Sequence, residues 1–121
     1  MAAPNIVGVT TITGKTDVTS IDVTATAITT NSAASNQVYK INSLIISNID
    51  GTNDADVTVE FVRGGTGYAL ASVITVPAAA TLVIVSKDNG IYMEEGDSIE
   101  CTASAAGDLQ AILSYDIITD Q

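Results

Sequence analysis

The chain has 121 residues, of which 46% are apolar, and its formal net charge is −10. Its only cations are Lys15, Lys40, Arg63 and Lys87, set against 14 carboxylates. Four scattered cations do not form the basic stripe that binds a phosphate backbone, and the same charge balance opposes an anionic membrane surface. No stretch reaches the roughly 18 uninterrupted apolar residues of a membrane-spanning helix. We therefore expect neither nucleic acid nor a membrane as a partner.

The length predicts one domain over residues 1–121, because a second hydrophobic core could not be built from so short a chain. The N-terminal stretch MAAPNIVGVTTITG has neither the basic region nor the long apolar run of a secretory signal. We expect a soluble protein.

Apolar and polar residues alternate with a period of two through almost the whole chain, and this predicts strands. From Ile21 to Ala27, for example, apolar residues alternate with Asp22 and two threonines. Segments rich in Gly, Asn and Asp, which tolerate the backbone of tight turns, separate the runs. The fold class expected is all-β, as a single antiparallel β-sandwich or jelly-roll-like barrel. In chain order the expected strands are 5–12, 17–29, 37–49, 56–63, 67–76, 81–86, 90–93, 97–104 and 108–118.

Two runs depart from strict alternation: Ser43–Ile49 has consecutive apolar residues at 44–46, and Thr81–Val85 has them at 82–85. Such runs fit strands that are covered on both faces, the second face by the protein itself or by another chain. A lone sandwich of this size has one inner layer, so we expect another copy or a partner to cover the second face. Ile46 and Ile84 are the candidate interface residues.

Two glycine-containing turns resemble ligand loops only in part. Asp50–Asp56 has the oxygen ligands of a calcium loop, but Ala55 and Phe61 stand where that loop needs Gly and Glu. We expect a hairpin turn there, with weak cation binding as the alternative. Gly64–Gly67 lacks the Lys-Ser/Thr pair of a phosphate cradle, so a glycine-rich hairpin is expected instead.

Residues for catalysis are scarce. The chain has no histidine, which excludes a Ser-His-Asp or Cys-His arrangement and a histidine zinc site. The single cysteine, Cys101, stands between Ile99 and Ala103 on the apolar face of an alternating run and is predicted to lie in the core. Glu94, Glu95 and Asp97 form the densest carboxylate cluster, but they stand in a predicted turn where we expect water to solvate them. We therefore predict no catalytic, cofactor-binding or metal-binding residue and no enzyme.

Three segments carry a family resemblance: APNIVGVTTITGKT, VYKINSLIISNIDGTNDADVTVEFVR and VPAAATLVIVSKDNGIYMEEGDSIECTASAAGDLQAILSYDII. Together they resemble small virion structural proteins of tailed bacteriophages, particularly those of cyanobacterial and other marine phages. The ordered combination in the last segment is the most specific part.

The resemblance implies a virion protein that is made in the host bacterial cytoplasm and carries no catalytic residues. Two roles fit it. One is a capsid decoration or cement protein, often a trimer, that binds the major capsid protein on the assembled head. The other is a neck, collar, tail or fibre-attachment component. A fibre is the less favoured reading, because the chain has neither an internal repeat nor a coiled-coil segment.

Overall fold

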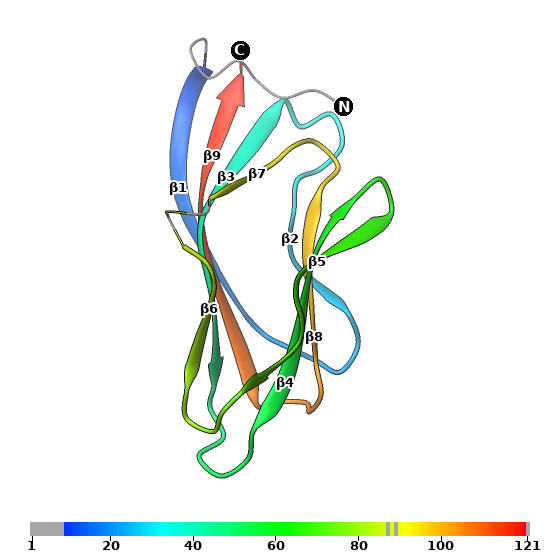
Figure 1. The fold of residues 1–121 in the computed structure, drawn as a ribbon. Helices are drawn as coiled ribbons and strands as arrows, with labels where there is room; N and C mark the ends of the chain where they lie inside the picture. Colours follow the sequence, from blue (N-terminus) through cyan, green and yellow to red (C-terminus); the bar gives the residue numbers. More distant parts are fainter. Residues whose placement is uncertain (1–8, 87, 89, 121) are drawn as a thin grey trace.

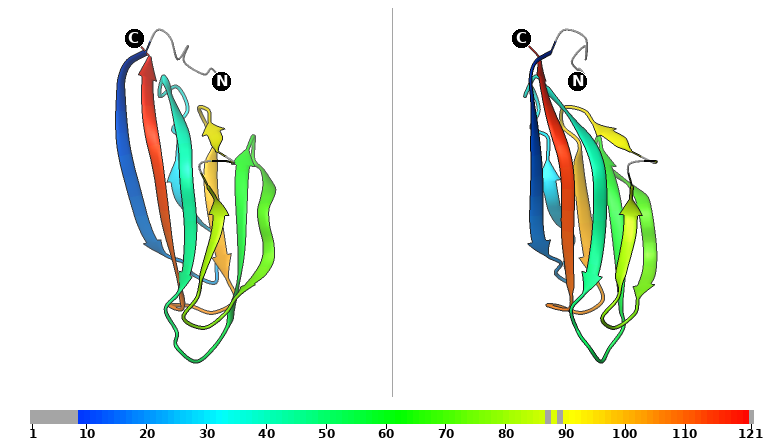
Figure 2. Two further views of the ribbon diagram at one scale, coloured as in Figure 1. Left: turned by 60° about the vertical axis from the view of Figure 1, so that its left-hand side comes forward. Right: turned by 90° about the vertical axis from the view of Figure 1, so that its left-hand side faces the viewer.

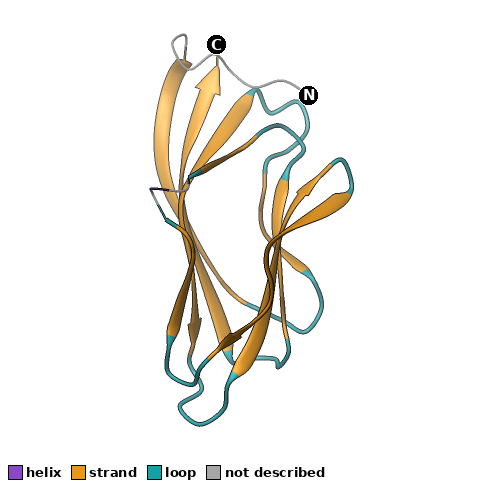
Figure 3. Cartoon of the chain, viewed as in Figure 1, coloured by secondary structure: helices purple, strands orange, loops and turns teal. Residues whose placement is uncertain are grey.

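The structure is a computed structural model that describes residues 9–86, 88 and 90–120. These residues form nine strands and no α-helix, so no helix among them could cross a membrane. Figure 3 shows the loops gathered at the two ends of the molecule, with the strands running between them. The strands are β1 (Val9–Ser20), β2 (Thr26–Thr30), β3 (Gln37–Asn48), β4 (Ala55–Arg63), β5 (Thr66–Val76), β6 (Thr81–Val85), β7 (Ile91–Met93), β8 (Ser98–Ala103) and β9 (Leu109–Asp120).

The strands form two sheets that face each other (Figures 1 and 2). The five-stranded sheet has the order β1-β9-β3-β6, with β7 also paired to β3, and the four-stranded sheet has the order β2-β8-β4-β5. Strands therefore pair from the outside of the sequence inward: β1 with β9, β2 with β8, β3 with β6, and β4 with β5, all antiparallel. This nesting is the topology of a jelly roll. The predicted all-β antiparallel sandwich is confirmed.

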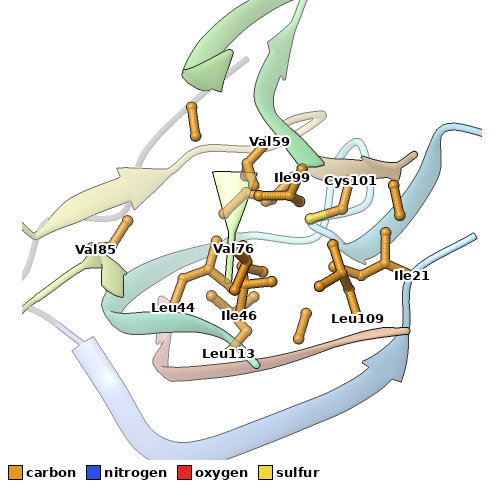
Figure 4. Close-up of a cluster of buried hydrophobic side chains, with 14 of the residues drawn as sticks. Ile21, Leu44, Ile46, Val59, Val76, Val85, Ile99, Cys101, Leu109 and Leu113 are labelled. Carbon is orange, nitrogen blue, oxygen red and sulfur yellow. The ribbon is translucent and has the colours of Figure 1, made fainter. Parts of the chain in front are cut away.

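The hydrophobic core lies between the sheets and consists mainly of small branched side chains. Alternation along each strand sends every second residue inward, which is why the burial of β4 and β8 also alternates. Figure 4 shows Leu44, Ile46 and Leu113 of the five-stranded sheet near Val59 and Ile99 of the four-stranded sheet. The apolar positions predicted to alternate into the core in β4, β8 and β9 are buried, except that Phe61 and Ile117 are half-buried and pack against the core, and Ile118 is buried out of phase.

The first part of the chain differs from the expectation. Strand β1 runs without a break through Gly14, so it joins the described part of the expected strand 5–12 to the start of 17–29. Residues 5–8 lie outside the described residues. The chain then crosses between the sheets from Ile21 to Ala25, where the Ile21 amide donates to the Leu109 carbonyl. Of the alternating apolar residues predicted to form one buried face, only Ile21 is buried; Val23 is 52% exposed.

Cys101 lies in the core, as the alternation predicted, with 2% of its surface exposed. Burial raises the pKa of its thiol from 9.0 to about 12. Because the folded chain keeps this proton to higher pH than the unfolded chain does, the thiol favours folding below pH 9.0, and this contribution is lost as the pH rises towards about 12.

We expect a thiol reagent to label Cys101 in the folded protein only as fast as the protein unfolds. Cys101→Ala should lower the free energy of unfolding by about 1 kcal/mol at neutral pH, because it leaves a small cavity. It should also reduce the loss of stability between pH 9.0 and about 12. Labelling rates and denaturant titrations at several pH values measure these effects. Rapid labelling of the folded protein would contradict the core position.

Candidate interaction surface

A row of apolar side chains crosses the outer face of the five-stranded sheet. Ile112 of β9 lies directly opposite Val18 of β1 on one side and Ile45 of β3 on the other, and Ile45 lies opposite Val83 of β6. Residues directly opposite each other in antiparallel strands project from the same face. Val18 and Val83 at the ends are 72% and 57% exposed, and Ile45 and Ile112 between them are half-buried. We call these four residues the outer apolar row.

Short hydroxyl side chains border the outer apolar row on both sides. On one side, Thr16 and Ser114 lie opposite each other with their hydroxyl oxygens 3.2 Å apart. On the other side, Ser47 and Thr81 do the same, also with 3.2 Å between their oxygens. The two hydroxyls of each pair are within hydrogen-bonding distance of each other, and the exposed Gln110, opposite Ser47 and Ser20, is a longer side chain in the same border.

This face carries almost no charge. Over the described stretches 14–20, 40–47, 81–83 and 110–116, the only ionisable groups that face outward are Lys40 and Asp116, which lie directly opposite each other. Their charges cancel, although the whole chain has a formal net charge of −10. A partner can therefore approach the outer apolar row without electrostatic repulsion from the groups around it.

The outer face of the four-stranded sheet has the opposite character. Glu60 of β4 lies directly opposite Glu100 of β8, and Asp56 alternates onto the same face of β4. Like charges directly opposite each other repel and are best kept in water. The acidic charge of the chain is therefore concentrated away from the outer apolar row.

The two interface candidates from the sequence do not belong to the outer apolar row. Ile46 is fully buried in the core and lies opposite Leu82, which also packs inward, so the expectation that Ile46 faces a partner is wrong. Ile84 lies at an irregularity between β3 and β6, where it is half-buried and packs against the core. Each lies one position from a residue that does face outward, namely Ile45 and Val83.

A shallow groove of about 430 Å³ lies beside β5 and β7 and contains aromatic side chains. The chain has four tyrosines and one phenylalanine, and three of these five residues, Phe61, Tyr68 and Tyr92, line the groove. Tyr68 and Tyr92 are 58% and 46% exposed. The Arg63 guanidinium carbon also lines it and stands 5.1 Å from the centre of the Phe61 ring. Aromatic and arginine side chains are enriched in binding hot spots, so this groove is a second candidate contact.

Arg63 also makes a bidentate contact with a buried carboxylate, that of Asp97. Its Nε and Nη2 donate to the two carboxylate oxygens of Asp97 at 3.0 and 2.6 Å, and Nη2 lies 2.9 Å from Glu94. Asp97 is fully buried, whereas the Arg63 side chain is 38% exposed. The hydrogen bonds to Asp97 raise the pKa of Arg63 further, and the carboxylate charges act in the same direction. The pair is thus a structural link between the end of β4 and the turn before β8.

The turn at 94–97 was expected to be solvated, and this is wrong for two of its three carboxylates. Asp97 also accepts a hydrogen bond from the Glu94 amide at 2.7 Å, and Glu95 is 9% exposed and accepts from the Asn36 amide at 2.7 Å. Pairing of β4 with β8 brings Arg63 to this turn from 34 positions away. Alternation within one strand carries no signal for such a partner.

The carboxylates of the Asp50–Asp56 loop hold the loop itself. Asp50 accepts hydrogen bonds from the Thr52 amide at 2.8 Å and from Asn53, and these bonds lower its pKa. Asp54 accepts from the Ala78 amide at 3.0 Å, and Asp56 accepts from the Thr75 hydroxyl at 2.7 Å. The three oxygens are therefore turned towards three different partners. Across the described residues, no group of three or more acidic or cysteine side chains is arranged to hold a metal ion.

The expected hairpin at Gly64–Gly67 is confirmed. Strand β4 ends at Arg63 and β5 begins at Thr66. Gly64 and Gly65 between them have φ values of 62° and 79°, in the left-handed region that glycine adopts without strain.

Comparisons with known proteins support the fold. No protein-family model matches the chain, and no curated protein matches it significantly. A solved structure of Bacillus endospore appendages, which form disulfide-linked pili, is similar with a TM-score of 0.56 and 20% identity, over 92% of this chain and 88% of that one. Two structures of a pentameric capsid protein from metagenomic phage sequences align at 19% identity and a TM-score of 0.40, over 87% of this chain. The alignments span 62% and 59% of those two capsid chains. The first likeness supports the sandwich fold, and the other two, at that score, add nothing to it.

Asp97→Asn should destabilise the protein by about 3 kcal/mol, because it removes the charge that pairs with Arg63 at a buried position. Glu94→Gln is the matched control, since it makes the same change in a partner of the same guanidinium whose side chain is 34% exposed. Glu94→Gln should lower the free energy of unfolding by less than about 1 kcal/mol. Urea titrations of both variants measure the difference, and equal costs would contradict a special role for the buried carboxylate.

Removal of divalent cations should leave the melting temperature unchanged, because the Asp50–Asp56 carboxylates already accept hydrogen bonds within the protein. Thermal melts with and without a chelator test this, with added calcium as the reciprocal condition. A shift of several degrees in either direction would reveal a cation site at this loop.

Proposed function

We propose that the protein is a structural component of a bacteriophage virion, and that it acts as a capsid decoration or cement protein. The observation that carries the proposal is the outer apolar row, an uncharged strip on the surface of a strongly acidic chain. Contiguous apolar surface of this kind usually marks a protein contact. The resemblance to phage structural proteins supplies the identity of the partner, which is the major capsid protein or another virion protein.

The fold and the chemistry of the chain are compatible with this role. Jelly rolls are common in viral capsid domains, and this is an argument by analogy of fold. The proposed role is non-enzymatic, in line with a sequence that has no histidine for a Ser-His-Asp or Cys-His arrangement. The single cysteine lies in the core, so a disulfide between copies would require the fold to open.

The proposed mechanism is stabilisation of the assembled shell by mass action. A protein that binds the shell but not its separated subunits shifts assembly towards the shell, by about 2.7 kcal/mol per site at a free concentration a hundredfold above the dissociation constant. The acidic face of the four-stranded sheet would then point towards the solvent. Its charge would keep neighbouring particles apart.

The alternative position is the neck, collar, tail or a fibre attachment of the same particle. The contact surface would be the same in either place, and the number of copies distinguishes them. The trimer implied by the resemblance is one possible arrangement of the copies.

Quantitative mass spectrometry of purified particles of the virus that encodes the chain is the direct test. We expect copies on the order of hundreds per particle for decoration of a symmetric head, and about a dozen or fewer for a neck or tail ring. A protein expressed during infection but missing from the particles would overturn the proposal.

Substituting one residue of the outer apolar row tests whether this row is the surface that binds the particle. Val83→Lys should weaken binding to particles by about tenfold or more, because it places an ammonium group where apolar surface is buried. Val23→Lys is the matched control, since Val23 is a valine of similar exposure, 52% against 57%, outside the row. Binding is measured by co-sedimentation with particles stripped of the native protein. Equal binding by the two variants would exclude the row as the contact.

A further inference from the structure

The sandwich has several strand edges with one unpaired side, and β1 differs from all the others. A strand edge presents unpaired backbone donors and acceptors that can pair with another chain, and most proteins blunt such edges. Edge strands β2, β6 and β7 have only five, five and three residues. Strand β5 is longer, but its pairing is interrupted by two irregularities and Val73 has a φ of 49°. These are the usual means of blunting an edge.

Over most of its length strand β1 is neither short nor irregular. It carries Lys15 and Asp17 on the side that faces the core, opposite the buried Tyr115 and Leu113. Such charges also blunt an edge, so a strand that pairs there must match them. From Thr11 to Ser20, β1 pairs with β9 in an unbroken register of ten residue pairs. Within the described part of the chain it has no strand on its other side, and Figure 2 shows it at the margin of the five-stranded sheet. Long, regular and unpaired, this edge is suited to receive another strand.

The charges of β1 identify the strand that fits. The edge has one cation, Lys15, and one anion, Asp17, so it is neutral in a chain of net charge −10. Both residues face the same side of the strand, and their charged atoms lie 3.8 Å apart. A second β1 that runs antiparallel about Thr16 places each Lys15 opposite the Asp17 of the other copy. Opposite charges directly across an antiparallel pair stabilise it.

The neighbouring symmetric registers of two antiparallel β1 strands do not pair opposite charges in this way. Pairing about position 15 would set the two lysines against each other, and pairing about position 17 would set the two aspartates against each other. In the register about Thr16, threonine faces threonine at the centre, which is a favourable cross-strand pair. Val18 then lies opposite Gly14, where no side chain obstructs it.

The geometry points to a twofold dimer in which the free edges of β1 from two copies pair antiparallel about Thr16. The two five-stranded sheets become one continuous sheet, and both outer apolar rows lie on the same side of it. The contact is isologous and closes with two copies. This inference does not depend on the proposed virion function, and it predicts a dimer where the resemblance implied a trimer.

Disulfide trapping tests the register. In the proposed pair the two Thr16 Cα atoms are about 4.5 to 5.5 Å apart, within the range that a disulfide bridges. Ile12 faces the same side of β1 and is also exposed, but its symmetry mate lies about 27 Å away, eight residue steps along the paired strand. Thr16→Cys should therefore cross-link under mild oxidation and Ile12→Cys should not. The buried Cys101 leaves the wild type as an unlinked control.

Charge substitution tests the affinity. Lys15→Glu makes both cross-strand pairs repulsive and should raise the dimer dissociation constant by about tenfold or more. Lys40→Glu is the matched control: it changes the net charge equally, but Lys40 is an exposed residue of β3, away from the β1 edge. A mixture of Lys15→Glu and Asp17→Lys proteins should restore dimers that neither forms alone, because their charges are again complementary. Sedimentation equilibrium gives the masses, and circular dichroism checks that each variant is folded.

Several outcomes would overturn the dimer. A wild-type protein that stays monomeric at millimolar concentration has no such contact. A trimer that Lys15→Glu leaves intact would place self-association on another surface. Cross-linking at position 12 as fast as at position 16 would exclude this register, and equal weakening by Lys15→Glu and Lys40→Glu would show that only net charge matters.

Discussion

The insertion of the last strand between the first and the third is the interaction on which the structure depends. Strand β9 pairs with β1 and with β3 along almost its full length, and each pairing joins segments that are far apart in the sequence. The other pairs nest inside this one, down to the β4–β5 hairpin. Such long-range pairing must overcome the entropy of closing large loops, so we expect folding to be slow for a chain of this size.

The same insertion creates the surface with which the protein is proposed to bind its partner. Val18, Ile112 and Ile45 come from three strands that are distant in the sequence, and they form a row only because β9 separates β1 from β3. The residues that flank Ile112 and Ile45 along their strands fill the core from the other face; they are Ala111, Leu113, Leu44 and Ile46. Since the chain has few large residues, it builds both its core and its contact surface from many small branched side chains.

Charge is distributed differently over the outer faces of the two sheets. The outer face of the four-stranded sheet carries opposed glutamates, whereas the central outer face of the five-stranded sheet carries one matched pair. A net charge of −10 keeps copies apart in solution and opposes non-specific association. Association is therefore favoured only where the local surface is neutral, which holds for the outer apolar row and for the edge of β1. Both features belong to the same sheet.

The fold class, the strands from residue 37 onward and the core position of Cys101 could be predicted from the sequence. These follow from alternation and turn residues, which are local signals because a strand's period of two and a turn's need for glycine act over a few residues. Near the N-terminus these local signals predicted the strand boundaries incorrectly. The expected strands 5–12 and 17–29 leave residues 13–16 as a break, but these residues lie within β1, where pairing with β9 outweighs the local preference.

Which residues contact each other across the sandwich depends on how distant strands pair. Alternation shows that Ile45 and Ile46 face opposite sides, but in a run that is apolar at both positions it does not show which side is the core. The burial of Asp97 depends on Arg63, which arrives through the pairing of β4 with β8. The free edge of β1 likewise depends on the order of strands in the sheet. Each of these properties belongs to pairs of segments that are distant in the sequence, and no local pattern encodes their pairing.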